Sequence, residues 1–304
     1  EKRSYINTVG PFWDANEVWL ITAGGAMFAA YPHWYATMFS GFYIPLVFML
    51  LALILRGVSF EFRGKVDNSK WKNTWDWTLF VGRLLPPILW GVVLANFMTG
   101  MPINQEKEMI GGFVQFLHPF ALLGGLMFLM LTITHGLQFI TIRTTGELQE
   151  RARDLGKKVA PITIILFLAF IVVGYIISDV FTYHGQTFMV IPILAWVSLL
   201  FANLYNTQKL DLNAFTLTSI TIILLIGSIF IGMFPRVMIS SISDAYSLTV
   251  YNAASGPYTL KVMTYFSIAL LPFVLGYQGW SYYIFRKRIK KNDEIKRNYC
   301  KMNN

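Results

Sequence analysis

The stretch GPFWDANEVWLITAGGAMFAAYPHW, residues 10–34, places two carboxylates at the start of an apolar segment. Its apolar part, residues 12–31, has the roughly 20 residues that a helix needs to cross a bilayer. Asp14 and Glu17 are three residues apart, so they share one face of that helix. An ionisable pair at membrane depth is costly and marks a candidate functional site. The stretch therefore predicts a membrane helix with an acidic site at its start.

The composition of the chain is that of an integral membrane protein. Hydrophobic residues make up 55% of the 304 residues, charged residues make up 13%, and the mean hydropathy is +0.51. Ordinary soluble domains carry about 25% charged residues. The single cysteine, Cys300, excludes an intrachain disulfide and a metal site built from several thiolates. The basic residues behind the net charge of +9 lie between apolar runs, where they orient a membrane protein, and this argues against nucleic-acid binding.

Eight apolar stretches are long enough to form transmembrane helices. The connection between the first two is so short that they must form an antiparallel hairpin. The chain has no low-complexity linker, so a single polytopic domain over residues 1–304 is the simplest organisation. The sequence thus predicts an all-α integral membrane protein with a helix-bundle architecture. The eight predicted spans cover residues 12–31, 36–60, 78–98, 113–142, 159–181, 188–205, 214–234 and 262–285.

The basic residues of the connecting segments are divided unequally between the two sides of the membrane. With eight spans, 21 of the 25 Lys and Arg residues fall on one side, including a basic tail over residues 286–304. The other side holds Lys107, Arg236 and Lys261, and Arg83 lies just inside the third span. Cytoplasmic loops carry such an excess of positive charge, so the tail and the C-terminus are predicted to be cytoplasmic.

The acid pair has two interpretations. Two carboxylates near the cytoplasmic end of a helix could accept protons where bulk water stops, which suits a proton pathway. The spacing D-x-x-E is also a capping-box pattern, with Asp14 as the N-cap and Glu17 at the third helical position. Arg83 could pair with an acid, but near the membrane surface its side chain can reach the headgroups, so we interpret it as an interface anchor. The small residues from Ala23 to Ala30 favour tight helix packing.

The four histidines, His33, His118, His135 and His184, bear on whether the chain carries haem by itself. His118 and His135 fall in one predicted span but are 17 residues apart, which places them on different faces and nearly a membrane thickness apart. These two histidines therefore cannot be the ligands of two stacked haems along one face of the helix. A metal or haem site near the outer surface stays open, but hydrogen-bonded structural histidines are the favoured interpretation.

Motifs for independent catalysis are absent from the sequence. No Gly-rich phosphate loop, HExxH or CxxC occurs. In RTTGELQERARDLGKK, residues 143–158, Thr144 with Glu147 three residues later suggests the start of a short cytoplasmic helix.

Several segments resemble those of subunit II of the cytochrome bd quinol oxidases. Besides GPFWDANEVWLITAGG, these are SGFYIPLVFMLLALILRGVSFEFR at residues 40–63, RTTGEL at 143–148 and WSYYIFRKR at 280–288. The resemblance runs from Glu1 to the tail. The first two motifs are long and specific, RTTGEL is moderately specific and the last is weak.

The resemblance implies nine transmembrane helices, of which the eight predicted here would be the second to the ninth. A missing first helix fits a chain that starts at Glu1 rather than at methionine. It further implies a partner, subunit I, that carries two b-type haems, haem d and the quinol-oxidising loop, while subunit II binds no haem and no metal. Some members have a small accessory subunit. The complex oxidises quinol and reduces dioxygen to water in the bacterial plasma membrane, among lipids and quinone, and generates a proton motive force.

The resemblance also implies roles for three residues of the opening stretch. Asp14 would lie on the proton path from the cytoplasm, Glu17 would assist it, and Trp19 would lie near an oxygen-access route. The alternative function is a proton- or ion-coupled secondary transporter, which would explain the acids but should show paired broken helices. A self-sufficient cytochrome b would need facing histidines.

Overall fold

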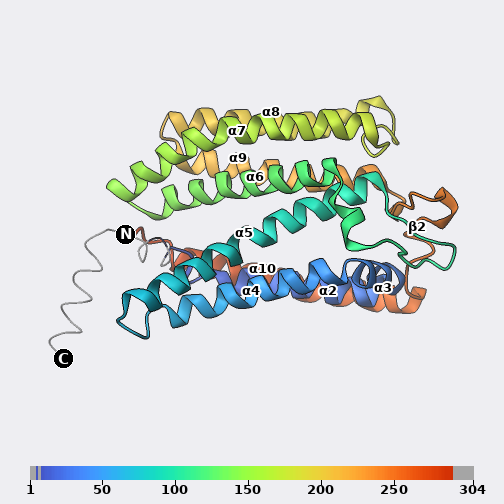
Figure 1. Ribbon diagram of the computed structural model, residues 1–304, viewed down its shortest axis with the longest axis horizontal. Coiled ribbons are helices and arrows are strands. Elements are labelled where there is room, and N and C mark those ends of the chain that lie inside the picture. The colour runs from blue at the N-terminus through green and yellow to red at the C-terminus, as the bar shows by residue number, and fades with distance from the viewer. Residues whose placement is uncertain (1–4, 6–7, 290–304) are drawn as a thin grey trace.

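The computed structural model describes residue 5 and residues 8–289, and these form an elongated bundle of helices (Figure 1). Figure 1 shows two layers, with α6 to α9 in one, α2, α4 and α10 in the other, and α5 crossing between them. The predicted all-α membrane bundle is confirmed. The longer helices are α2 (Trp13–Ala30), α3 (Pro32–Gly41), α4 (Tyr43–Phe62), α5 (Ser69–Thr99), α6 (Pro119–Arg143), α7 (Glu147–Ile177), α8 (Val190–Thr207), α9 (Asp211–Met233) and α10 (Pro257–Ile284).

Within the described residues, seven helices are long and apolar enough to cross a membrane, close to the predicted eight. They are α4 to α10, with α8 extended by the short 3-10 helix η2 (Gln186–Met189). The helix outside this set is α2. Its 18 residues would span about 27 Å at 1.5 Å per residue, so its length suffices. The polar residues in its first turns, Asp14, Asn16 and Glu17, lower its hydropathy.

The second predicted span, residues 36–60, is wrong at its start because the chain bends there. α3 ends at Gly41 and α4 begins at Tyr43, with Phe42 buried between them. Pro45 explains the break, since a proline ring clashes with the carbonyl group four residues earlier and cannot donate a hydrogen bond to it. The carbonyl group concerned belongs to Gly41.

The predicted antiparallel hairpin is nevertheless confirmed, with α3 at its turn. The Trp13 ring of α2 stacks on the Phe60 ring of α4 at 5.2 Å. Glu17, one turn after Trp13, pairs with Arg56, one turn before Phe60, so the two helices run in opposite directions. The Trp13 ring also lies beside Gly57 of α4, where a Cβ atom would be at 3.4 Å, an ordinary contact distance.

The remaining helices share a continuous apolar core. α5 and α6 approach so closely that a Cβ atom at Gly91 would lie 2.2 Å from the Gly124 carbonyl oxygen. The Phe120 and Phe170 rings stack at 4.9 Å between α6 and α7. A helix begins after Thr144 as predicted, but it is not short and Thr144 does not cap it. Thr144 instead ends α6, and α7 runs without interruption for 31 residues from Glu147.

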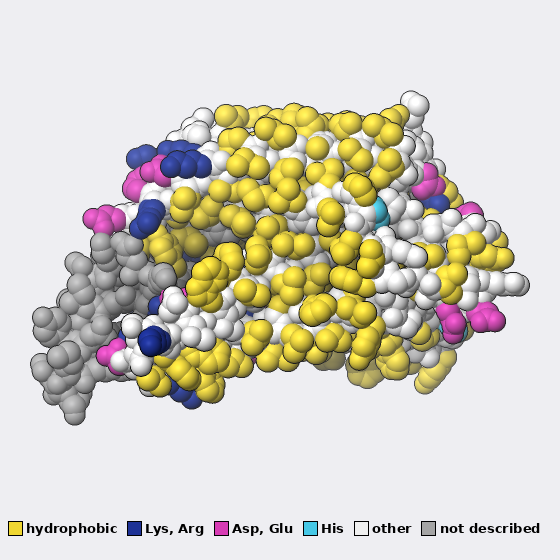
Figure 2. Space-filling view, in the orientation of Figure 1, with side chains coloured by type: hydrophobic (Ala, Val, Ile, Leu, Met, Phe, Trp, Pro, Cys, Tyr) yellow, Lys and Arg dark blue, Asp and Glu magenta, His cyan; other side chains and the backbone are white. Residues whose placement is uncertain are grey.

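Charged side chains gather at the two ends of the bundle, as the visible face in Figure 2 shows, while hydrophobic side chains cover its middle. We call the end that holds the start of α2 and the end of α10 the basic end. At the opposite end, a two-stranded sheet of β1 (Arg236–Met238) and β2 (Leu248–Thr249) caps the helices. The Lys107 ammonium donates to the Ala245 carbonyl oxygen at 3.0 Å in this cap, and Arg236 pairs with Asp179 at 2.9 Å. Most of the predicted basic tail falls outside the described residues.

Candidate functional site

Asp14 lies in the first turn of α2, at the basic end. The N-cap of this helix is Phe12, and no side chain caps it. The capping-box interpretation of Asp14 and Glu17 is therefore wrong. The Asp14 side chain is exposed and makes no hydrogen bond or ion pair with any residue that the structure describes.

Glu17 has a different environment, because it pairs with Arg56 of α4. Both side chains are 24% exposed, and Arg56 is the only charged residue of α4 before its last turn. A lone guanidinium in an apolar helix is costly unless it is paired, and Glu17 supplies the counter-charge. Arg56 is one of the 21 basic residues that the charge pattern assigns to the cytoplasmic side. Its position inside the apolar run YIPLVFMLLALILRGVSFEF was the signal that it needed a partner.

Asn16 fixes α2 to α10. Its amide group donates to the Tyr282 hydroxyl at 3.1 Å, and its carbonyl oxygen accepts from Gln278 at 3.2 Å. The Phe12 ring stacks on the Tyr282 ring at 4.3 Å next to this contact. The start of α2 is thus held by α4 through Glu17 and by α10 through Asn16, and Asp14 is left as the unpaired carboxylate of this cluster.

Trp19 lies five residues after Asp14, which is about 7.5 Å further along the axis of α2. Its side chain is half-buried. Neither α2 nor α10 contains a buried residue among those described. Large apolar side chains on both helices are therefore open, including Ile21 at 75% exposure and Phe273 at 77%. Such a surface requires cover by lipid or by another protein.

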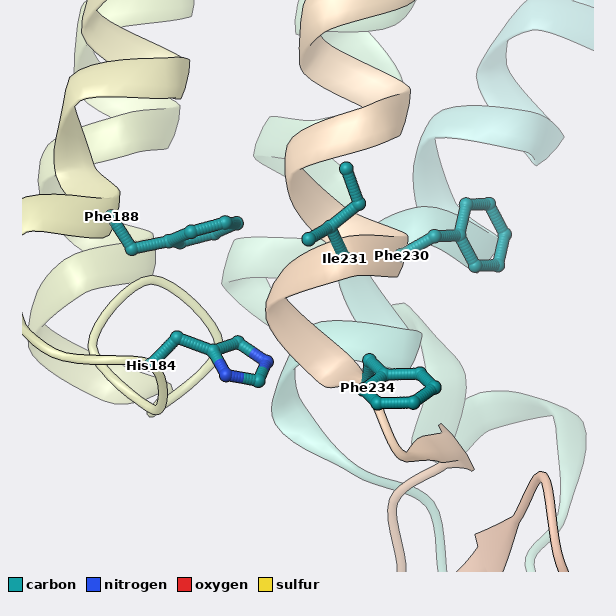
Figure 3. A pocket seen from close by; sticks show the side chains of 5 residues that line it. All are labelled: His184, Phe188, Phe230, Ile231 and Phe234. Atoms are coloured by element: carbon teal, nitrogen blue, oxygen red, sulfur yellow. The ribbon is translucent and has the colours of Figure 1, made fainter.

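An apolar pocket lies at the end of the bundle opposite the acids, and Figure 3 shows the side chains that line it. It encloses about 380 Å³ between the segment before α8 and the end of α9. Its lining has four apolar side chains and one imidazole, so it lacks the paired ionisable groups of the α2 cluster. The lining residues are His184, Phe188, Phe230, Ile231 and Phe234.

Comparison with known proteins identifies the family. The family model described as cytochrome bd terminal oxidase subunit II matches residues 1–285. The chain belongs to this family. Subunit 2 of the cytochrome bd ubiquinol oxidase of Bacillus subtilis strain 168 is 47% identical over 295 residues, which cover 97% of this chain and 87% of that protein.

Two further relatives agree with this assignment. Subunit 2 of the cytochrome bd-I ubiquinol oxidase of Escherichia coli strain K12 is 35% identical, with 98% of this chain and 87% of the relative covered. The probable cytochrome oxidase subunit 2 of Haemophilus influenzae is 34% identical, with coverages of 93% and 83%. The resemblance inferred from the motifs is confirmed, and the chain is a subunit of a terminal oxidase.

Two histidines of this subunit II chain are engaged within the fold. His118 is the N-cap of α6, where its Nδ1 atom accepts from the Ala121 amide at 3.3 Å and its Nε2 atom contacts the Thr99 hydroxyl at 3.3 Å. Burial lowers the pKa of His118, which favours this neutral, capping form. The Nδ1 atom of His135 contacts the Thr218 hydroxyl at 2.8 Å. Within residues 8–289, no group of three His, Cys, Asp or Glu side chains could hold a metal ion.

Proposed function

We propose that this chain is the haem-free subunit II of a quinol:dioxygen oxidoreductase and that it supplies proton and oxygen access to a haem-bearing subunit I. The relatives named as ubiquinol oxidase subunits support a quinol substrate. The observation that carries the proposal is the exposed Asp14 carboxylate in the first turn of α2, which has no hydrogen bond or ion pair within the described part of the chain. Reduction of dioxygen to water takes up protons as well as electrons, so a proton path is required.

The environments of the two acids support a division of roles. Arg56 holds the Glu17 carboxylate in an ion pair, so Glu17 is a fixed charge beside the path. Asp14 has no partner in the described chain, and its carboxylate is exposed at the basic end. We infer that Asp14 accepts protons from the cytoplasm and passes them toward the partner. The excess of Lys and Arg at this end supports its cytoplasmic orientation, and with it a cytoplasmic C-terminus in a bacterial plasma membrane.

The open surfaces of α2 and α10 support the assignment of a partner. They expose large apolar side chains on the same helices that hold Asp14 and Trp19. If subunit I covers this surface, a proton at Asp14 crosses directly between subunits. Trp19 would then border an oxygen route from the membrane interior to the partner. In the family, b-type haems and haem d supply the electron transfer to dioxygen, and we assign them to subunit I.

The histidine contacts support the haem-free role. A haem ligand must present a free ring nitrogen to iron, whereas both ring nitrogens of His118 have partners within the fold. The His135 imidazole stacks on the Phe215 ring at 4.6 Å and contacts the Thr218 hydroxyl through Nδ1, so its structural contacts use one ring nitrogen and one ring face.

The Asp14→Asn variant tests the proposed proton path. It should slow oxygen reduction while leaving the haem content and the subunit composition unchanged, because only proton supply is impaired. The expected decrease is about tenfold or more, since proton transfer by a positioned group contributes about 10²- to 10⁴-fold. The matched control is Asp67→Asn, which removes another exposed carboxylate at the basic end, paired only with Lys72. Equal oxygen reduction rates in both variants and the wild type would refute the path through Asp14.

A further inference from the structure

Arg83 differs from three other arginines near the basic end, each of which has an acidic partner. Arg56 pairs with Glu17, Arg63 with Asp76, and Arg153 with Asp211. The Arg83 side chain is exposed and has no ion pair or hydrogen bond with any residue in the described part of the chain. A cation without a counter-charge in an apolar segment is expensive, so its environment must supply one.

The Arg83 side chain points toward the basic end. Its backbone is level with Arg56, because a Cβ atom on the neighbouring Gly82 would lie 2.7 Å from the Ala52 carbonyl oxygen and 3.1 Å from the Arg56 Cβ atom. Its guanidinium lies 5.3 Å from the centre of the Phe60 ring. Phe60 is four residues nearer the end of α4 than Arg56, a rise of about 6 Å. The arginine therefore extends from the membrane interior toward the headgroup level, as predicted for an interface anchor.

The position of the Phe60 ring defines the depth of the guanidinium. Phe60 lies in the last turn of α4, which ends at Phe62. On α5, Trp77 and Phe80 precede Arg83 on the side of the basic end, and their side chains are 62% and 54% exposed. Exposed aromatic side chains of this kind mark the boundary between headgroups and acyl chains. The charged end of Arg83 is thus placed where lipid phosphates lie.

The local charge favours an anion at this place. Arg56 is close enough for its charge to act on Arg83, and its own counter-charge is already provided by Glu17. No carboxylate of the described chain lies within ion-pair distance of Arg83. The exposed neighbour of Arg83 on the same face of α5 is apolar, because Phe80, three residues earlier, is 54% exposed. An anionic headgroup attached to acyl chains matches both features, whereas a free anion matches only the charge.

We propose that Arg83, held over Phe60 between α4 and α5, binds the phosphate of an anionic phospholipid in the leaflet at the basic end. The Phe60 ring supports the guanidinium from one side by a cation–π contact, which leaves its N–H groups to donate to phosphate oxygens. The acyl chains lie against the exposed apolar side chains of α4 and α5. The site is separate from the proposed roles of Asp14 and Trp19, so it can fail or hold independently of them.

The test compares lipid retention by Arg83→Gln and by Arg63→Gln in the intact oxidase complex. Arg63 is a matched control, because it also lies at the basic end but is already paired with Asp76 at 2.6 Å. Each complex is purified in mild detergent, and bound phospholipids are identified by native mass spectrometry. We expect the wild type and Arg63→Gln to retain a phosphatidylglycerol that Arg83→Gln loses. Arg83→Lys keeps the charge and should retain part of the binding if Arg83→Gln fails to assemble.

A titration separates the lipid from other sources of negative charge. Added phosphatidylglycerol should raise the melting temperature of the delipidated wild-type complex, and its apparent affinity should fall about fivefold in Arg83→Gln, since one arginine near an anionic surface contributes about that factor. Phosphatidylcholine and inorganic phosphate should not stabilise the complex. The proposal would be overturned if the wild type and Arg83→Gln retained equal amounts of lipid, or if Arg83→Gln and Arg63→Gln lost equal amounts. It would also be overturned if inorganic phosphate stabilised the complex as much as phosphatidylglycerol does. If Arg83→Gln retained the lipid but its subunits associated more weakly, the counter-charge of Arg83 would be a carboxylate of the partner subunit. That result would also overturn the proposal.

Discussion

The Glu17–Arg56 ion pair should be the main polar contact that fixes α2 against α4, and a double-mutant cycle measures its strength. Exposed ion pairs contribute about 0–1 kcal/mol, whereas breaking a fully buried pair costs about 3–5 kcal/mol. With both side chains 24% exposed, we expect the pair to lie between these limits. A coupling free energy of about 2 kcal/mol follows, which is nearly a 30-fold change in the unfolding equilibrium constant.

The cycle consists of Glu17→Gln, Arg56→Gln and the variant with both substitutions. Each single variant leaves one uncompensated charge beside the apolar face, while the double variant removes both charges and leaves two amides that can bond to each other. The melting temperature of the purified complex should therefore fall by several degrees in each single variant, and the double variant should melt well above the additive expectation. Additive losses would show that the two side chains do not interact in the native complex and would refute this account of how α2 is held.

Three further predictions concern other parts of the chain. Asp211→Asn should destabilise the fold by about 3–5 kcal/mol, because it leaves the Arg153 guanidinium, which is 3% exposed, without its buried partner, and thermal unfolding of the complex measures this loss. Trp19→Ala should change the apparent oxygen affinity of the oxidase without changing its haem content, and an unchanged affinity in oxygen-titrated turnover would contradict the access role. Because burial holds the pKa of His118 below its usual 6.5 in the fold, its contribution to stability should be complete above about pH 6.5 and should be lost as the pH falls. On acidification, the melting temperature of His118→Asn should therefore drop less than that of the wild type, because asparagine can still cap α6 but does not titrate. Equal drops in the two proteins would contradict this prediction.

Hydropathy and helix length were sufficient to predict most of the bundle, because a membrane span must satisfy its own backbone and be apolar over a fixed length. The same measure failed where local chemistry interrupts an apolar run. Pro45 divides the second predicted span at Phe42, although residues 46–55 after it are uniformly hydrophobic. The Thr144 and Glu147 pattern was compatible with a helix start, but Gly146, with φ at +68°, makes a tight turn instead, and α7 begins after it.

The candidate site was predictable only in part. The position of Asp14 and Glu17 on one helix follows from their spacing, but their different partners depend on which helices pack around α2. The pairing of Glu17 with Arg56, 39 residues away, and the contacts of Asn16 with α10 are tertiary features that spacing alone cannot provide. The direction of the Arg83 side chain toward the basic end could be predicted, since the energetic cost of a buried charge and the length of its side chain depend little on neighbouring helices. The roles of Asp14 and Trp19 stay predictions.

The most direct test of the central claim is to purify the chain from its native membrane under conditions that preserve complexes and to record a reduced-minus-oxidised absorption spectrum together with the subunit composition. We predict a second, larger membrane subunit, b-type and d-type haem bands from the complex, and no haem signal from this chain after the subunits are separated. The account would be contradicted if haem stayed with the separated chain. It would also be contradicted if the chain were purified alone and colourless while the oxidase activity of the membrane was recovered in other fractions.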